Sequence, residues 1–462
     1  MPSAISPSPS PSPSPSSFPQ TPTPNTSPNT SPTPRITKFT NCLIPLNNQL
    51  VPRDIWVDSS TGKILDPQQA FYEHKLSPDQ TLDLGGRILA PGFIDVQLNG
   101  AIGFDFSEPR DTKEEYDAGL REVNRALIRT GVTSYLPTVT SQRAEVYPKV
   151  LPSLGPSGAP RDPSHGAESL GAHVEGPFLS PGKNGIHKKS VLRTAHTGLQ
   201  DLIDVYGASN IPPETPDTAP AQSPTIKLLT AAPELGTMQS LIPALSARGI
   251  AYSIGHSDAT YEQALSALSA GARMITHLFN AMRPFAHRHP GIFGLLGQSE
   301  LPDCPRPFYG LIADGIHLHP TSVQIAFNAH PDGMVLVTDA MKLCGMPDGE
   351  YAWTNGERIV KRGALLTLVG GEGEGRIAGS SATLVQCVNN FRRWAGARTV
   401  AAIKAVTETP ARMLGVEGVK GVVRVGADAD LVVLEDVVVE GEGEGGRELR
   451  VEQVWKFGVR VY

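Results

Sequence analysis

Hydrophobic and polar positions follow a repeated order through the middle of the chain. Between residues 90 and 340, short apolar or β-branched runs end in polar residues, and segments of helical length such as 112–130 and 259–271 separate most of them. The runs are RILAPGFIDVQ, VTSYLPT, SLGAHVEG, TIKLLTAAPE, IAYSIGHS, RMITHLFN, FYGLIADGIH and GMVLVTDA. Strands alternating with helices in this way predict an α/β fold, a (β/α)8 TIM barrel whose active site lies in the loops after the strands.

The flanks of this region have a different pattern. Residues 36–89 and 416–462 are rich in Val, Leu and Ile runs broken by Gly and Asp, which is typical of β-strands. Each flank alone has about 50 residues, which is marginal for independent folding. We therefore expect one small β-sandwich built from both chain ends, beside a barrel over residues 90–415. A separate C-terminal domain is the alternative.

Polar stretches punctuate these regions. Residues 1–35 consist of Ser, Pro and Thr repeats, which predict a disordered or polyproline-II tail; a phosphorylated regulatory tail is the functional alternative. The stretches 155–168, 207–225, 370–375 and 440–446 are predicted loops. We interpret 207–225 and 370–375 as surface insertions, because loops tolerate added length at little cost.

Composition narrows the class of protein. A net charge of −6 and a pI near 6.1 disfavour a nucleic-acid or anionic-membrane partner. The chain has neither an apolar run of about 18 residues nor the basic-then-apolar start of a signal peptide. Its cysteines lack C-x-x-C spacing, which favours reduced thiols and a cytoplasmic location; they are Cys42, Cys304, Cys344 and Cys387.

Three of the predicted strands end in residues that bind metal. Glu175 ends the third strand, and His256 and His277 follow the fifth and sixth. A single histidine at a strand end is more often structural than a ligand. One carboxylate and two imidazoles at the same end of one barrel, however, form a His2Glu set that suits a catalytic divalent metal with room for water. The pattern predicts one metal site.

Other strand ends supply candidates for proton transfer and substrate binding. Asp339, after the eighth strand, is placed to act as a general base, and its alternative role is the N-cap of a following helix. Asp314 and His317 can bind substrate or cap a loop. Arg288 can clamp an anion because a guanidinium matches phosphate geometry, although alone it would be a surface arginine.

Long motifs in this sequence resemble the N-acetylglucosamine-6-phosphate deacetylase family of the amidohydrolase superfamily. The resemblance covers residues 36–462, and the Ser/Pro tail and Pro/Gly inserts suggest a eukaryotic, fungal member. The motifs are APGFIDVQLNG, GAHVEGPFLSPGKNGIH, LLTAAPE, SIGHSDATYEQALSALSAGARMITHLFNAM, HRHPGIFGLL, LIADGIHLHP, VLVTDAM and GSSATL.

The resemblance implies hydrolysis of the acetamide of N-acetylglucosamine 6-phosphate to glucosamine 6-phosphate and acetate. It implies one divalent metal, zinc, on Glu175, His256 and His277, with Asp339 as acid/base, and a homodimer whose partner subunit helps to complete the phosphate site. A loop at 377–379 is expected to lie against the substrate. The implied substrate contacts are Gln97, Ile186, His187, Asn280, Ala281, Arg288, Asp314, His317, Ile377, Ala378 and Gly379.

Two positions depart from what related sites carry. Two-metal members of the superfamily use an H-x-H pair after the first strand, where this chain has Gln97 and Asn99. Amides bind metals poorly, so a second ion would lose two ligands, and a single-metal enzyme is expected. The family often has a small residue where Ile186 stands, and this larger side chain is expected to narrow the pocket.

Three alternatives use the same fold. A dihydroorotase-like or hydantoinase-like enzyme predicts the H-x-H pair and often a carboxylated lysine on the fourth strand, where the only lysine, Lys227, lies near the strand start. A deacetylase of linear N-acyl amino acids gives no reason for Arg288 and His317. A non-catalytic scaffold would be expected to have lost at least one of the four central residues, yet all are present: Glu175, His256, His277 and Asp339.

Overall fold

The computed structural model describes residues 35–213, 224–299, 304–353, 358–370, 374–439 and 446–462. Pro34–Tyr462 form one compact unit. The predicted tail, except for Arg35, lies outside the described residues. So do residues 214–223, 371–373 and 440–445, which belong to three of the predicted loops.

Eight parallel strands form the barrel, and each of the eight predicted runs contributes one of them. Neighbouring strands pair in chain order. The fold predicted for this region is therefore confirmed. The strands are β8 (Phe93–Leu98), β11 (Val132–Thr140), β13 (Ala172–Glu175), β14 (Ile226–Ala231), β15 (Ala251–Ile254), β16 (Met274–Ile275), β17 (Phe308–Ile312) and β18 (Met334–Val337).

The first and last strands close the barrel mainly at their carboxyl ends. The Asp339 amide donates to the Gln97 carbonyl, and the Asn99 amide donates to the Ala340 carbonyl, each at 2.9 Å. At the other end, the carbonyls at 405–406 accept from β8 and β18 in place of a direct strand pair. The closure brings the chain around Gln97 and Asn99 beside Asp339.

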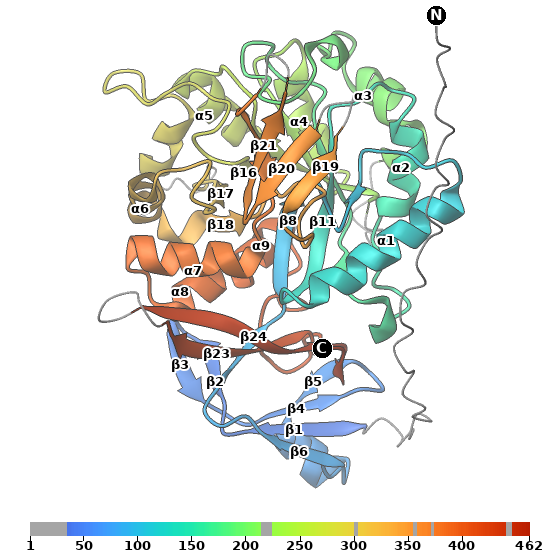
Figure 1. The fold of residues 1–462 in the computed structure, drawn as a ribbon, viewed down its shortest axis with the longest axis vertical. Coiled ribbons are helices and arrows are strands. Elements are labelled where there is room, and N and C mark those ends of the chain that lie inside the picture. The colour runs from blue at the N-terminus through green and yellow to red at the C-terminus, as the bar shows by residue number, and fades with distance from the viewer. Residues whose placement is uncertain (1–34, 214–223, 300–303, 354–357, 371–373, 440–445) are drawn as a thin grey trace, which may run out of the picture. The chain divides into compact units, whose positions relative to one another are not determined.

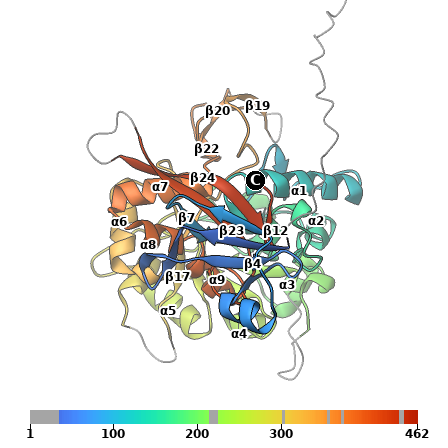
Figure 2. The ribbon, with the colours of Figure 1, turned by 90° about the horizontal axis from the view of Figure 1, so that it is seen from below.

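Seen from below, the helices from α1 (Lys113–Ile128) to α7 (Leu384–Ala395) follow one another in chain order around the molecule (Figure 2). The first begins at the N-cap Thr112, whose side chain accepts from the Glu115 amide, and its apolar face is buried. A 3-10 helix, Ile292–Gly297, takes the place of a helix after β16. The α-helices are α1 (Lys113–Ile128), α2 (Tyr147–Leu154), α3 (Leu199–Tyr206), α4 (Met238–Ser246), α5 (Tyr261–Ser269), α6 (Pro320–Ala329), α7 (Leu384–Ala395), α8 (Thr399–Lys404) and α9 (Glu408–Leu414).

The two chain ends build two further sheets, as predicted. One has the order β5-β4-β1-β6, and the other has the order β25-β24-β23-β7-β2-β3. Because β23 pairs with β7, the alternative of a separate C-terminal domain is wrong. The strands are β1 (Ile36–Thr40), β2 (Leu43–Leu46), β3 (Gln49–Pro52), β4 (Ile55–Asp58), β5 (Lys63–Leu65), β6 (Gln80–Asp83), β7 (Ile88–Pro91), β23 (Leu431–Val438), β24 (Arg447–Lys456) and β25 (Val459–Arg460).

The two sheets share one apolar core, which makes them a sandwich. Phe39 of the first sheet packs edge-on against Trp455 of the second, with 4.8 Å between ring centroids. In Figure 1, β23 and β24 lie between the barrel and the sheet that contains β1 and β4. The predicted domain boundaries at 89/90 and 415/416 remain predictions.

The predicted first strand is divided in two. Ile88–Pro91 joins the sandwich as β7, whereas Phe93–Leu98 enters the barrel as β8, with Gly92 between them. A Cβ atom at Gly92 would lie 2.0 Å from the Thr133 hydroxyl, so only glycine permits this close passage from one sheet to the other. The sequence does not predict this division, because the apolar run RILAPGFIDVQ continues across it.

A four-stranded antiparallel sheet follows β18 and was not predicted. Its strands are β19 (Gly349–Ala352), β20 (Arg358–Arg362), β21 (Leu365–Val369) and β22 (Ile377–Ser380). It has a small core of its own, in which Ile359 and Leu366 pack with Met341. Figure 1 shows β19–β21 near the upper ends of β8 and β11, and β22 pairs with Ala340, directly after Asp339.

In the described part of the chain, no helix combines the length and the apolar character that a bilayer crossing requires. All four cysteines are buried and free of disulfides.

Candidate active site

The three predicted metal ligands meet at the carboxyl end of the barrel. Glu175 is the last residue of β13, and His256 and His277 each lie two residues beyond their strands, β15 and β16. Glu175 Oε1 lies 3.0 Å from the Nε2 atoms of both histidines, which are themselves 3.0 Å apart. All three side chains are buried. The strand pairing thus places one carboxylate and two imidazoles around a common point.

The chemistry of these atoms fits a cation. His256 Nδ1 lies 2.7 Å from the Lys183 carbonyl, which can only accept, so this nitrogen carries the ring proton. Nε2 faces Glu175 and His277, and as a metal ligand it would present a lone pair to an ion between them. Lone pairs at this spacing repel one another unless a positive charge lies between them, and ligands of a tetrahedral zinc stand roughly 3–3.5 Å apart. The cluster can hold a divalent ion.

The backbone at these strand ends adopts an unusual conformation. His256, His277 and Asp339 have φ angles of 47°, 26° and 45°, in the left-handed region that non-glycine residues rarely occupy. Such residues cost about 1–3 kcal/mol each and persist only where surrounding contacts hold them. Three such residues at one end of the barrel indicate that surrounding contacts hold these loops so that the three side chains point toward the site.

Asp339 lies across from the metal ligands and has an amide partner. Asn99 Nδ2 donates to Asp339 Oδ1 at 2.8 Å, and Gln97 Nε2 donates to Glu175 Oε2 at 3.2 Å. The amides of Gln97 and Asn99, at the end of the first barrel strand, therefore each hold one carboxylate. No helix follows Asp339, so the alternative role as an N-cap is wrong.

Glu175 and Asp339 differ in their affinity for protons. Burial opposes ionisation of Glu175, but the hydrogen bonds from His256 and His277 outweigh it and hold its pKa well below the usual range. Burial, and then the negative charge of Glu175, raise the pKa of Asp339 to about 6. One carboxylate therefore stays ionised as a ligand, while the other is set to exchange a proton near neutral pH.

His187 stands beside the cluster as a neutral ring. Its centroid is 4.5 Å from that of His256, and burial followed by the charge of His256 lowers the pKa of His187 to about 3. The Ser141 amide donates to His187 Nδ1 at 3.2 Å, so the ring proton is on Nε2. His187 can therefore donate one hydrogen bond to a ligand.

The buried Asp314 and the half-buried His317 form a second pair. His317 Nδ1 lies 2.7 Å from Asp314 Oδ2, and the amides of Ile316 and His317 donate to Asp314 Oδ1. Burial disfavours the charged ring, but the hydrogen bond to Asp314 raises the pKa of His317 overall. The pair can present a cationic imidazole to an anionic ligand, and Asp314 also caps its own loop.

The remaining predicted substrate contacts lie at different depths. Asn280 and Ala281 are half-buried directly after His277, and Ala281 accepts a backbone bond from Ser257. Arg288 is exposed in a tight turn, and in the part of the chain that the structure describes it does not contact the metal ligands. Ile186 is 62% exposed, and its narrowing of the pocket remains a prediction.

Residues 377–379 form part of a strand, β22, rather than the predicted loop. The Met341 amide donates to the Ser380 carbonyl at 2.8 Å, which fixes this strand two residues beyond Asp339. Ile377 is exposed and Ala378 is buried. Gly379 has a φ of +114°, and a Cβ atom there would lie 2.7 Å from Met341 Cγ. The strand edge is thus held against the turn that carries Asp339.

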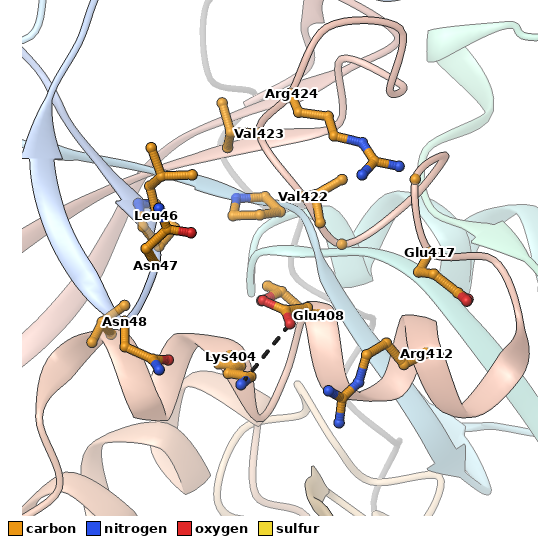
Figure 3. Close-up of a pocket in the computed structure, with 16 residues that line it drawn as sticks. Leu46, Asn47, Asn48, Lys404, Glu408, Arg412, Glu417, Val422, Val423 and Arg424 are labelled. Carbon is orange, nitrogen blue, oxygen red and sulfur yellow. Dashed lines mark ion pairs between the residues drawn. The ribbon is translucent and has the colours of Figure 1, made fainter. Parts of the chain in front are cut away.

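Two other places in the described residues differ from this cluster. The carboxylates of Glu168, Asp428 and Asp430 also converge, but the ammonium groups of Lys420 and Lys456 already lie among them. The hollow in Figure 3 lies at the other end of the barrel, and its Lys404 pairs with Glu408. It contains none of the predicted site residues.

Sequence reasoning missed two contributors to the site. The sequence indicates Asn99 only as the replacement of a metal ligand. Glu234, after β14, ends the LLTAAPE motif, and the sequence predicts no role for it. Glu234 accepts hydrogen bonds from Ser180, Ser257 and the Asp258 amide. A polar residue at a strand end was the available signal in both cases, but their partners lie 23 to 240 positions away in sequence.

Comparisons with known proteins identify the family of this chain. A model of the amidohydrolase family matches residues 88–444. N-acetylglucosamine-6-phosphate deacetylase from Homo sapiens is 43% identical over 404 residues, which cover 87% of this chain and 92% of that protein.

Solved structures of similar proteins show the same arrangement of strands and helices. The deacetylase from Pasteurella multocida has a TM-score of 0.71 at 25% identity, covering 92% of this chain and 99% of that one. A variant from Mycobacterium smegmatis, in complex with N-acetyl-D-glucosamine-6-phosphate, has a TM-score of 0.70 at 25% identity, covering 93% of this chain and all of that one. The chain therefore belongs to the amidohydrolase family and, within it, to the N-acetylglucosamine-6-phosphate deacetylases.

Proposed function

We propose that this protein hydrolyses the acetamide of N-acetyl-D-glucosamine 6-phosphate to D-glucosamine 6-phosphate and acetate, with one zinc ion held by Glu175, His256 and His277. The observation that carries the proposal is the convergence of these three side chains at 3.0 Å beside the half-buried Asp339. The names of the relatives support the substrate, and the amides at Gln97 and Asn99 support a single ion.

A bound ion would supply Lewis acidity, polarising the acetyl carbonyl and acidifying water. The protein's own residues then move the protons. Asp339 accepts a proton from the attacking water at the carboxylate oxygen that Asn99 does not hold, and passes it to the departing amine nitrogen. A pKa raised to about 6 suits a group that must accept and then release a proton near neutral pH.

Other side chains bind and orient the substrate in this proposal. His187 Nε2 donates to the acetamide oxygen, because its Nδ1 already accepts from Ser141. His317, whose pKa is raised by Asp314, meets the sugar phosphate together with Arg288 and the backbone at Asn280 and Ala281. A partner subunit in a homodimer would help to enclose the phosphate. The cytoplasm is the proposed compartment.

Acetate release from N-acetylglucosamine 6-phosphate tests this function. We expect turnover by the zinc-loaded protein, loss of turnover after chelation and recovery on adding zinc back. N-acetylglucosamine without its phosphate is the matched control and should be turned over far more slowly. Equal rates with the two sugars would contradict the phosphate assignment, and turnover that survives complete removal of metal would contradict the metal centre.

A cyclic-amide hydrolase is the second candidate that the fold permits. Lys227 lies at the second position of β14, whereas the end of that strand that pairs with Glu175 carries Thr230. The chain thus lacks a lysine at the place where a carboxylated bridge would be needed, and no observation in the described residues favours this candidate.

A further inference from the structure

We propose that Glu234 is a positioning residue for the metal ligand His256. This inference rests on the proposed metal centre. It adds to that centre the carboxylate of Glu234, which contacts neither metal nor substrate. Glu234 lies in the loop after β14, between the loops that follow β13 and β15, and it is half-buried. Its carboxylate joins these three loops through hydrogen bonds.

The contacts of Glu234 satisfy both of its oxygen atoms. Oε1 accepts from Ser180 Oγ at 2.5 Å and from the Asp258 amide at 2.7 Å, while Oε2 accepts from Ser257 Oγ at 2.7 Å. Ser180 belongs to the loop after β13, and Ser257 and Asp258 directly follow His256 in sequence. A carboxylate is the side chain that can accept from all three donors at once.

These bonds act on His256 from two sides. On one side, the Ser180 amide donates to the His256 carbonyl at 2.9 Å, and the same loop supplies the Lys183 carbonyl that fixes the ring through Nδ1. On the other side, Glu234 holds the two residues after His256. Because His256 has a φ of 47°, its backbone needs such external support to remain in place.

The consequence concerns the affinity for metal. A ligand that binds at about 2 Å tolerates little displacement, and partners that orient metal ligands typically change metal affinity or activity 10- to 100-fold when they are removed. Removal of the Glu234 carboxylate should loosen the ring of His256 while leaving Glu175 and His277 unchanged. The variant should therefore fold but bind zinc more weakly.

Competition with a chromophoric chelator, on the full chain, measures zinc affinity without relying on activity. We expect Glu234→Ala to bind zinc about 10- to 100-fold more weakly than the wild type. Glu234→Gln keeps an acceptor oxygen for two of the three donors, so its zinc affinity should lie between those of the wild type and of Glu234→Ala. With excess zinc, kcat of the alanine variant should recover most of the wild-type value, because the catalytic groups themselves are intact.

The control is Glu122→Ala, which removes an exposed carboxylate on α1 that pairs with Arg125 and should leave zinc affinity unchanged. Wild-type zinc affinity in a folded Glu234→Ala protein would overturn the inference, even if its melting temperature had fallen. Should that variant not fold, Ser180→Ala combined with Ser257→Ala removes two of the three bonds and carries the same criterion. An absence of zinc binding by the wild type would instead overturn the proposed metal centre.

Discussion

At the scale of single residues, a substitution can separate the proposed acid/base role of Asp339 from metal binding. In Asp339→Asn the new amide oxygen can still accept from Asn99, so the turn should stay in place while the side chain can no longer take a proton. We expect kcat to fall about a thousandfold, with zinc content and substrate affinity retained. His277→Ala is the contrasting variant and should lose zinc. Near-normal turnover of Asp339→Asn would place the base elsewhere.

The amide at Asn99 makes a second prediction at this scale. Its hydrogen bond favours the ionised form of Asp339. Asn99→Leu removes that bond at similar volume, so the pKa of Asp339 should rise and the acidic limb of the kcat/KM profile should move to higher pH. Zinc content should not change, because Asn99 does not contact the ligands. A pH profile identical to that of the wild type would show that the amide has no part in proton transfer.

At the scale of elements, prediction from sequence succeeded where one pattern determined the structure. The barrel strands were found because each is a short apolar run that ends in polar residues, as in β13 and its terminal Glu175. Strands β19–β22 were missed because they are partly exposed and rest on a small core around Ile359 and Leu366. Likewise the roles of Asn99 and Glu234 depend on contacts between distant loops, which no local pattern records.

The strand β22 yields a prediction about this missed sheet. Gly379→Ala should displace the strand, because a Cβ atom would meet Met341 and the φ of +114° disfavours any side chain. We expect a loss of about 1–3 kcal/mol in stability and a clear fall in kcat, since Met341 adjoins the Asp339 turn. Gly363→Ala is the matched control: its φ is +58°, but its Cβ would meet no atom within 4 Å. Equal activity of the two variants would argue against a role for β22 at the site.

At the scale of the whole molecule, a buried ionic cluster ties the sandwich to the barrel. Lys456 of β24 contacts Asp430 at 2.8 Å, the Thr133 carbonyl of β11 at 3.1 Å, and Glu168. Its side chain is 1% exposed. Lys456→Met would leave Lys420 to compensate the buried carboxylates of Glu168 and Asp430, so we expect a loss of about 3–5 kcal/mol in the free energy of unfolding by urea. Lys113→Met, at an exposed pair, should cost less than about 1 kcal/mol.

The same cluster predicts how stability depends on pH. Burial opposes ionisation of Asp428 and Asp430, but Lys420 outweighs it and lowers the pKa of both. A carboxylate with a depressed folded-state pKa stabilises the protein above its unfolded value of about 3.9, and this contribution is lost as pH falls below that value. The melting temperature should therefore decline steeply below about pH 4, and less steeply in Lys456→Met. Parallel declines in the two proteins would contradict the prediction.

The central claim is that one metal ion binds Glu175, His256 and His277. Anomalous X-ray scattering at the zinc edge, from crystals of the zinc-loaded protein, tests it most directly. We expect a single strong anomalous peak about 2.0–2.2 Å from a Glu175 oxygen and from Nε2 of both histidines. A second peak of equal height beside Gln97 and Asn99, or a peak away from these three ligands, would contradict it.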